Sequence, residues 1–314
     1  MVSLPGFTRI QEASKNTLEY LDKRLQQDFY FKTEFTQLND ILGAGIEVGT
    51  NTVLGGRPGS GKSLFGLILA LQAAKQVNKE GKPRFNIIYW NWEMTSEQQM
   101  LRTFSHFHGK STQDLKAQYK EDSIKKLLQA KSEEIKNYPI YFSDSLTNIE
   151  SVHAAIIKMK QAIPGIPIIN IFDHSRLILG SDAAEAEEKK LFRLYSMCNT
   201  IKKMDCINIV LSQLNRKVED YIAQTGRYRA PNEADLFGAD AAGQFADTIA
   251  IMHNPSKYGT IGKEFYMDSE ERTKIKTANK LWMEIVKNRE GTLGRVVFNV
   301  NFAASSITNF SLNG

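Results

Sequence analysis

A glycine-rich stretch constrains the fold of this chain more than any other part of its sequence. It matches the pattern G-x-x-x-x-G-K-[ST] without exception, and its residues are Gly56, Arg57, Pro58, Gly59, Ser60, Gly61, Lys62 and Ser63. The apolar run 52–54 before it predicts a strand, and the run 64–74 after it predicts a helix. In such a strand–loop–helix unit, backbone N–H groups and the helix N-terminus bind phosphate oxygens.

We therefore expect the loop, together with Leu64 at the start of the helix, to bind a nucleotide. Lys62 would reach the β- and γ-phosphates, and the Ser63 hydroxyl would ligate Mg²⁺. A glycine-rich turn without a ligand is the alternative interpretation.

Short apolar runs alternate with helical patterns over most of the chain. The runs that we predict as strands are 52–55, 86–91, 140–142, 166–172, 207–212 and 248–252. They lack a polar face, which is typical of parallel strands covered by helices on both sides. Two later runs, 281–286 and 295–300, flank Gly291 and Gly294 and predict an appended β-hairpin. The pattern predicts an α/β fold with a mostly parallel central sheet, and the charged stretches 111–137 and 181–205 predict solvated helices.

An amphipathic pattern over residues 8–30 predicts a helix in front of this fold, with Leu18, Leu21 and Leu25 on one face. We divide the chain into an N-terminal arm, 1–34, and one domain, 35–314, instead of two equal domains. An exposed apolar stripe on the arm needs a partner to cover it.

The composition excludes several classes of protein. Of the 314 residues, 42% are hydrophobic and 24% are charged, which excludes wholesale disorder and fibrous repeats. The formal net charge of +5 permits a polyanionic partner without requiring one. Two cysteines, Cys198 and Cys206, offer no disulfide framework, and the longest apolar run is too short for a bilayer. With no apolar signal segment at the N-terminus, we expect a cytoplasmic protein without a membrane partner.

Three polar residues follow predicted strands directly. Asp173 ends the run 168–172 as a metal-supporting aspartate would, although Asn170 interrupts the run. Glu93 ends the run 87–92 and is a candidate general base for an attacking water, and Gln213 could sense a γ-phosphate. Carboxyl ends of parallel strands share one edge of a sheet, so the three side chains are expected near the loop. Ordinary polar residues at strand ends are the alternative.

Lys287 and Arg289 follow the predicted strand 281–286. Their i, i+2 spacing would place both cations on one face of an extended chain, where they could bind the phosphate of a neighbouring subunit. Two solvated cations at a hairpin turn are the alternative.

These pieces, in this order, resemble the RecA-like ATPase core of DnaB-type replicative DNA helicases. The matching stretches are GGRPGSGKS (55–63), WNWEMTSEQQMLR (90–102), INIFDHSRLI (169–178), IVLSQLNRKVED (209–220), GQFADTIAIMHN (243–254) and EIVKNREGTLG (284–294). The stretch 35–56 is similar to the family's entry into the phosphate loop, so the resemblance covers about residues 30–300.

The resemblance implies ATP bound with Mg²⁺ between the subunits of a six-membered ring, with single-stranded DNA in its centre. By motif, Lys62 and Ser63 would hold phosphate and metal, Asp173 would support the metal, and Glu93 would activate water. Gln213 would couple the γ-phosphate to DNA, and Lys287 with Arg289 would act on the neighbour's ATP. The helix at 8–30 would be the family's linker helix, which docks on the adjacent subunit.

The chain also departs from the family pattern. Little sequence precedes residue 8, so we expect a compact, phage-like version without the separate N-terminal domain that helps to assemble the ring and recruits primase. The family's Arg-Glu pair is absent from the stretch after the sensor strand, which leaves Phe237, Gly238 and Ala239 as DNA candidates there. Phe237 packed under its own loop is the favoured alternative. The further DNA candidates are Asn215, Arg216, Lys217, Arg227 and Arg229, and a solvated loop is the alternative for them.

The leading hypothesis is an ATP-hydrolysing helicase that moves 5′→3′ on single-stranded DNA and unwinds forked duplex for replication. A primase or a helicase loader would be further partners. A RecA- or RadA-like recombination or regulatory ATPase is the first alternative. A non-catalytic nucleotide-binding scaffold is the second.

Overall fold

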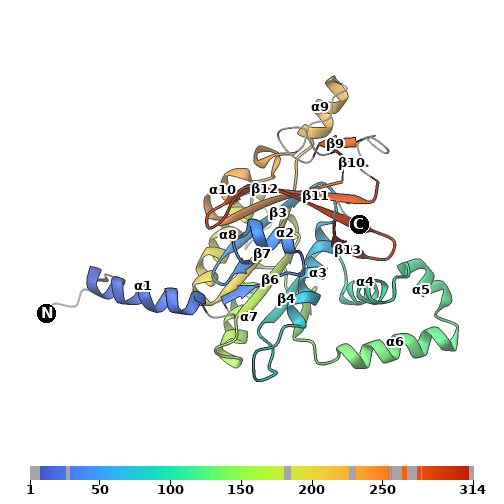
Figure 1. Cartoon of the computed structure of the whole chain (residues 1–314), viewed down its shortest axis with the longest axis horizontal. Coiled ribbons are helices and arrows are strands. Elements are labelled where there is room, and N and C mark those ends of the chain that lie inside the picture. The colour runs from blue at the N-terminus through green and yellow to red at the C-terminus, as the bar shows by residue number, and fades with distance from the viewer. Residues whose placement is uncertain are drawn as a thin grey trace.

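A nine-stranded sheet forms the centre of the molecule (Figure 1). The structure is a computed structural model that describes residues 8–25, 29–179, 185–225, 231–254, 256, 264–266, 274–276 and 278–310. The strand order is β13-β12-β11-β8-β3-β7-β6-β4-β5. The strands from β5 to β8 in this order pair in parallel, and β11, β12 and β13 extend the sheet in antiparallel pairs. The predicted α/β class with a mostly parallel sheet and an appended hairpin is confirmed.

The strands of this sheet lie close to the predicted runs. Their bounds are β3 Asn51–Gly56, β4 Asn86–Asn91, β5 Ile140–Ser143, β6 Ile168–Asp173, β7 Cys206–Gln213, β8 Thr248–His253, β11 Lys280–Asn288, β12 Gly294–Asn301 and β13 Ser306–Asn309. All residues of β4, β6 and β8 are buried, as the runs without a polar face predicted.

Helices cover both faces of the sheet, and each face has its own apolar core (Figure 1). On one face lie α2, Thr36–Ile41, and the almost completely buried α3, Lys62–Ala74. On the other face lie α7 Ile149–Ala162, α8 Glu187–Ile201 and α10 Ala239–Phe245. The buried parallel strands therefore gain their apolar contacts from helices that are distant in the sequence.

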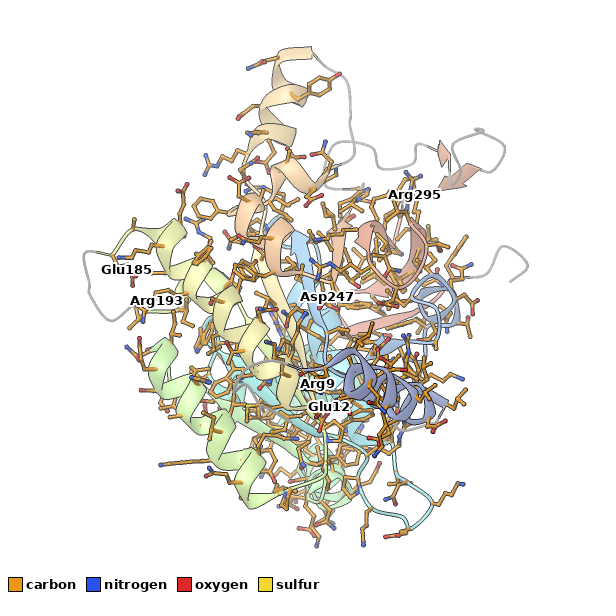
Figure 2. All side chains as sticks on the ribbon, turned by 90° about the vertical axis from the view of Figure 1, so that its left-hand side faces the viewer. Arg9, Glu12, Glu185, Arg193, Asp247 and Arg295 are labelled. Carbon is orange, nitrogen blue, oxygen red and sulfur yellow. The ribbon has the colours of Figure 1, made fainter. Side chains whose placement is uncertain are left out.

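The N-terminal helix, α1, is shorter than predicted. It spans Ile10–Leu25 and projects from the body of the molecule, with Leu18, Leu21 and Leu25 exposed (Figure 1). Figure 2 looks at the side from which α1 projects, with the helix toward the viewer. The predicted end at residue 30 is wrong, because β1, Tyr30–Phe31, pairs with β2, Ile46–Glu47. The phenyl ring of Phe31 is fully buried in the core, so burial of this side chain favours the strand over a longer helix.

Three helices lie to one side of the sheet around a small separate core of Leu115, Ile124 and Leu128 (Figure 1). They are α4 Ser96–His108, α5 Thr112–Gln118 and α6 Asp122–Ile135. The charged stretch 111–137 is thus two helices. The remaining described elements are α9 Lys217–Thr225, the antiparallel pair β9 Glu264–Tyr266 and β10 Lys274–Lys276, and short 3₁₀ turns at Ser175–Leu177, Lys202–Met204 and Glu233–Asp235. No helix among the described residues is long and apolar enough to cross a membrane.

A row of asparagines explains the polar interruption at Asn170. Asn170, Asn208 and Asn51 pair in register across β6, β7 and β3. The Nδ2 atom of Asn170 donates to Asn208 Oδ1 at 3.0 Å, and Asn208 Nδ2 donates to Asn51 Oδ1 at 2.9 Å. Buried amides are tolerated when their hydrogen bonds are made, so Asn170 belongs to the sheet and is no argument against the strand.

Candidate active site

The glycine-rich loop leaves the carboxyl end of β3 and enters α3 at Lys62. Gly61 has a φ of 91°, in the left-handed region that favours glycine, and a Cβ there would lie 2.9 Å from Leu281. A Cβ at Gly56 would lie 2.8 Å from the backbone oxygen of Met252. Among the described residues no side chain caps the N-terminus of α3, so its first N–H groups remain available to an anion.

Lys62 and Ser60 fit a phosphate bound in this loop. The ammonium of Lys62 is buried against the loop, where Nζ donates to the backbone oxygens of Gly56 at 2.6 Å and Arg57 at 3.2 Å. The Ser60 hydroxyl is buried and has no hydrogen-bond partner in the described part of the chain. Because unpaired buried polar groups are costly, an anion that accepts hydrogen bonds from both groups would suit the site.

Asp173 ends β6 directly beside the start of α3. Ser63 Oγ donates to Asp173 Oδ1 at 3.0 Å, and the Tyr89 hydroxyl donates to Asp173 Oδ2 at 2.9 Å. The residue is only 4% exposed, and this burial raises its pKa to about 6, against the hydrogen bonds from Tyr89 and Ser63 that lower it. A hydroxyl and a carboxylate side by side are the oxygen ligands that Mg²⁺ prefers, so this pair fits a metal bound to phosphate.

The carboxyl ends of neighbouring strands surround a cleft of about 400 Å³ beside the loop. Its lining includes Lys62 and Ser63 from the loop, Glu93 after β4 and Gln213 at the end of β7. The sheet order β3-β7-β6-β4 places these strand ends next to one another, as the sequence predicted. The Glu93 side chain is 55% exposed, so it is accessible to water.

Sequence reasoning missed three residues of this site: His174, Arg102 and Tyr89. His174 Nε2 lies 3.2 Å from Gln213 Nε2 and 3.8 Å from Glu93 Oε2, so the ring joins the two predicted residues. Arg102 reaches the cleft from α4, and Tyr89 supports Asp173 from β4. The position of His174 directly after Asp173 was a usable signal, whereas only the folded chain brings α4 to the cleft.

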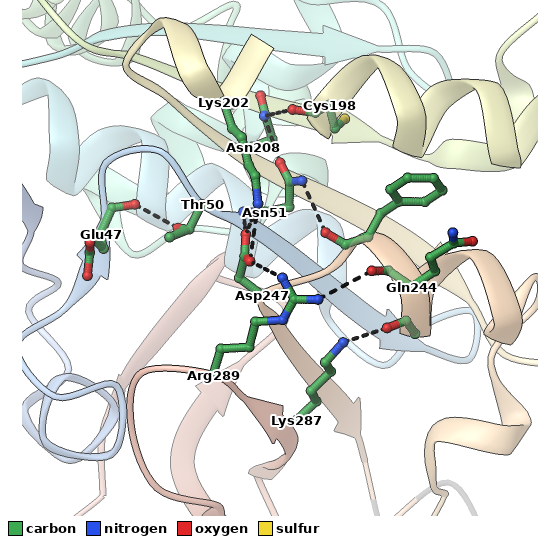
Figure 3. Close-up of polar contacts among 12 residues, drawn as sticks. Glu47, Thr50, Asn51, Cys198, Lys202, Asn208, Gln244, Asp247, Lys287 and Arg289 are labelled. Carbon is green, nitrogen blue, oxygen red and sulfur yellow. Dashed lines mark hydrogen bonds and ion pairs between the residues drawn. The ribbon is translucent and has the colours of Figure 1, made fainter. Parts of the chain in front are cut away.

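Lys287 and Arg289 lie beside the amino-terminal ends of the parallel strands, whereas the loop lies at their carboxyl ends. β11 runs antiparallel to β8, so its carboxyl end reaches the strand edge at which β3 begins. Lys287 Nζ donates to the backbone oxygen of Gly243, and Arg289 Nη1 donates to Asp247 Oδ1 at 2.9 Å (Figure 3). The length of β3, about 16 Å at about 3.3 Å per residue, separates the two ends. These cations therefore cannot reach a phosphate in their own loop.

The segment after β7 is tied to the glycine-rich loop. Arg216 and Lys217 are exposed at the start of α9, and Asn215 N–H donates to the backbone oxygen of Asp235 at 2.7 Å. Arg57 in the loop holds the carboxylate of Glu219 on α9 through two hydrogen bonds of 2.9 and 2.8 Å. Arg227 and Arg229, predicted as part of this cluster, lie outside the described residues.

Phe237 lies under its own loop. Its ring packs partly against the core formed with α8 and α10, and the Arg176 guanidinium lies 4.4 Å from the ring centroid. Its N–H donates to the backbone oxygen of Gln213 at 3.0 Å. Gly238, at φ 70°, precedes Ala239 at the start of α10. Base stacking on Phe237 would require Arg176 to move, whereas the bond to Gln213 links this loop to the cleft.

The fold and the site together define a P-loop NTPase with a RecA-like core: a phosphate loop between β3 and α3, and a carboxylate on a neighbouring parallel strand. The chain matches the family described as "DnaB-like helicase C terminal domain" over residues 31–311 and belongs to that family.

Relatives and solved structures agree with this assignment. The chain is 22% identical over 294 residues to the replicative DNA helicase DnaB of Helicobacter pylori, covering 91% of this chain and 57% of that protein. It is 24% identical over 287 residues to the DnaB of Geobacillus stearothermophilus, covering 90% of this chain and 57% of that protein. The chain thus spans somewhat more than half the length of these relatives.

Two solved structures share its fold. One, described as an ATPase domain, superposes with a TM-score of 0.78 at 20% identity, covering 97% of this chain and 100% of that one. A DnaB-like replicative helicase, solved in a study of its interactions with primase, superposes with a TM-score of 0.77 at 20% identity, covering 97% of this chain and 68% of that one.

Proposed function

We propose that this chain is an ATP-driven DNA helicase that works as a six-membered ring, moves 5′→3′ on single-stranded DNA and unwinds forked duplex during replication. The observation that carries the proposal is the distribution of functional groups between the two ends of the parallel strands. Phosphate-binding and water-activating groups converge at one end, and two cations stand at the other, beyond reach of the same chain's loop. A primase or a helicase loader would be a further partner.

ATP would lie with its phosphates in the loop 56–63. Lys62 would turn from the carbonyls of Gly56 and Arg57 to the β- and γ-phosphates, and the N–H groups at the start of α3 would hold phosphate oxygens. Ser63 and Asp173 would hold Mg²⁺, which supplies charge neutralisation at the phosphate oxygens when bound. Tyr89 would keep Asp173 oriented through its bond to Oδ2.

Glu93 would accept the proton of the attacking water. It stands at the end of β4, open to solvent and across the cleft from the loop. Gln213 would contact the γ-phosphate. Its side-chain amide, at the end of β7, would be held in place by the hydrogen bond to His174. Loss of the γ-phosphate would thus remove a contact at the end of β7, from which the proposed DNA-binding segment continues.

Hydrolysis would be completed by a neighbouring subunit. Lys287 and Arg289 cannot serve their own loop, so a ring that places one subunit's β11 edge against the next subunit's cleft would use them in trans. Such a head-to-tail contact forms a closed ring when repetition of the same rotation from subunit to subunit returns to the first subunit.

The arm would help to join these subunits. On α1, the side chains of Leu18, Leu21 and Leu25 are exposed within the described part of the single chain. An apolar groove of about 680 Å³ opens between α4, α5 and α6, lined by residues that include Met100, Leu101, Phe104 and Tyr119. Docking of α1 in the groove of a second copy would cover both surfaces.

Single-stranded DNA would contact the segment after β7. Its exposed cations, Arg216 and Lys217, suit backbone phosphates. The Arg57–Glu219 ion pair gives this segment a direct connection to the phosphate loop, so DNA binding and nucleotide state would influence each other.

A strand-displacement assay on forked DNA with a 5′ or a 3′ single-stranded tail tests the proposal. We expect ATP-dependent unwinding that requires the 5′ tail, together with hydrolysis stimulated by single-stranded DNA. Electron microscopy with an ATP analogue and DNA supplies the second test. Closed six-membered rings support a helicase, helical filaments support a recombination-type ATPase instead, and absence of hydrolysis supports a scaffold.

A further inference from the structure

The carboxylate of Asp247 lies at the centre of the polar cluster that contains Arg289 (Figure 3). Asp247 stands between α10 and β8. Its Oδ1 accepts a hydrogen bond from Arg289 Nη1 at 2.9 Å, and its Oδ2 accepts one from Lys202 Nζ at 2.9 Å. The peptide groups are joined as well, because Arg289 N–H donates to the backbone oxygen of Asp247 at 3.1 Å. Both the side chain and the backbone of Arg289 are therefore held by one residue.

Asp247 is itself fixed to the central sheet. Its Oδ2 accepts a hydrogen bond from the backbone N–H of Asn51 at 2.9 Å, and its own N–H donates to the Asn51 oxygen at 2.8 Å. Asn51 belongs to the row of buried asparagines, and Asn208 in that row also donates to the Cys198 oxygen at 3.0 Å (Figure 3). The Asp247 side chain is 11% exposed. It therefore has a defined position relative to β3, the strand that carries the phosphate loop at its other end.

The charges of the cluster leave Arg289 effective as a cation. A lone carboxylate beside an arginine would cancel the charge that attracts a phosphate. Here Lys202, whose side chain is 17% exposed, places a second positive charge beside the same carboxylate. The single carboxylate of Asp247 is thus shared between two cations, so it does not neutralise both, and Lys287, two residues before Arg289, adds a third cation nearby.

The guanidinium is oriented but accessible. Its Nη1 faces Asp247 and its Nη2 makes a long bond of 3.4 Å to the Gln244 oxygen, yet the side chain remains 48% exposed. A long side chain that must meet a phosphate loses rotamer freedom when it does so. An arginine that is already held loses less, and misplacement of a catalytic group by about 1 Å can cost about 100-fold in rate.

We propose that Asp247, braced by Lys202, is the positioning residue that presents Arg289 to the nucleotide of the adjacent subunit. This inference rests on the proposed function, in which Arg289 acts in trans.

The variant Asp247→Asn tests it, because asparagine keeps the shape and an oxygen for the Asn51 N–H while it removes the charge. We expect ATP turnover to fall about 10- to 100-fold with KM changed less than about threefold, since the variant's own phosphate loop is intact. Glu284→Gln is the matched control. It removes the negative charge of a different partly buried ion pair, between Glu284 on β11 and Arg295 on β12. We expect it to leave turnover within about twofold.

Mixed oligomers separate positioning from damage to the fold. Asp247→Asn chains are mixed with Lys62→Ala chains, which lack a working loop but carry an intact Arg289. In a random equimolar mixture about one quarter of the interfaces pair a working loop with a working arginine, so activity should rise above that of either variant alone. Arg289→Ala mixed with Lys62→Ala is the reference.

Recovery in both mixtures supports the inference. Recovery with Arg289→Ala but not with Asp247→Asn overturns it and leaves the proposed function standing. Recovery in neither mixture overturns action in trans and the positioning role together. A second variant, Lys202→Met, keeps the carboxylate and its bond to Asn51. It should lower turnover at least about threefold, because the Asp247 carboxylate would then offset the charge of Arg289 alone, and unchanged turnover would contradict the role of Lys202.

Discussion

The ion pair between Arg57 and Glu219 yields a sharp prediction about coupling between the nucleotide site and the proposed DNA-binding segment. Arg57 lies in the phosphate loop, and Glu219 lies on α9 two residues after the exposed Lys217. The guanidinium also donates to the Leu214 oxygen at 2.8 Å, which anchors it at the end of β7. Glu219→Gln removes the negative charge of the pair and keeps the length and shape of the side chain.

The expected magnitude follows from the geometry and the exposure. Hydrogen bonds to charged groups contribute about 1.5–3 kcal/mol. The Glu219 side chain is 41% exposed and Arg57 is 17% exposed, so solvent screening reduces this contribution to about 1 kcal/mol. Because about 1.4 kcal/mol corresponds to a tenfold change in an equilibrium constant, we expect the coupling between DNA and nucleotide to weaken about fivefold.

Binding measurements test this coupling more directly than rates do. The affinity for a fluorescent oligo-dT is measured by anisotropy with and without a non-hydrolysable ATP analogue, at one fixed salt concentration. Coupling free energies are reciprocal. The gain in DNA affinity caused by the analogue and the gain in analogue affinity caused by DNA should therefore fall by the same factor in Glu219→Gln.

Asp220→Asn is the matched control, because it removes the same charge from the adjacent, exposed position of α9. If both variants change the coupling equally, charge near the DNA explains the effect and the ion pair does not. An unchanged coupling in Glu219→Gln would refute the connection outright.

Three further outcomes test the remaining parts of the proposal. Arg289→Ala should bind the ATP analogue nearly normally and hydrolyse ATP on the order of 10³-fold more slowly; normal hydrolysis would exclude an arginine that acts in trans. Glu93→Gln should accumulate ATP-bound rings, because water loses its base, and rapid turnover in single-turnover assays would refute that role. Leu18→Ser combined with Leu21→Ser should reduce the fraction of rings in native mass spectrometry while the melting temperature of the monomer stays within about 2 °C, because both side chains are exposed; intact rings would show that α1 does not join subunits.

Much of the fold could be predicted from local pattern. The apolar runs found all six parallel strands within about two residues, because strands buried on both faces have to be apolar throughout. The end of α1 could not be predicted. The helical pattern continues past Leu25, and only the burial of Phe31 in the core places the chain in β1.

The candidate site likewise contains residues that the local sequence predicts and residues that only tertiary packing brings in. The positions of the loop at 56–63 and of Glu93, Asp173 and Gln213 beside it could be predicted from the sequence, because places at strand ends depend on the local apolar pattern. Arg102 could not be identified in this way, since its contact with the cleft depends on how α4 packs. Asn170 looked like a defect in a strand until its partners Asn208 and Asn51 were known.

Local sequence was therefore sufficient for the phosphate loop and for the kinds of groups that surround it. Strand order and direction were needed for the rest. Because β11 is antiparallel to β8, Arg289 lies at the end of the strands away from its own loop. There it contacts Asp247, which is 42 residues earlier in the chain. The Arg57–Glu219 pair spans 162 residues. Contacts over such separations depend on which strands are neighbours in the sheet, and the apolar pattern that buries each strand carries no record of its neighbours.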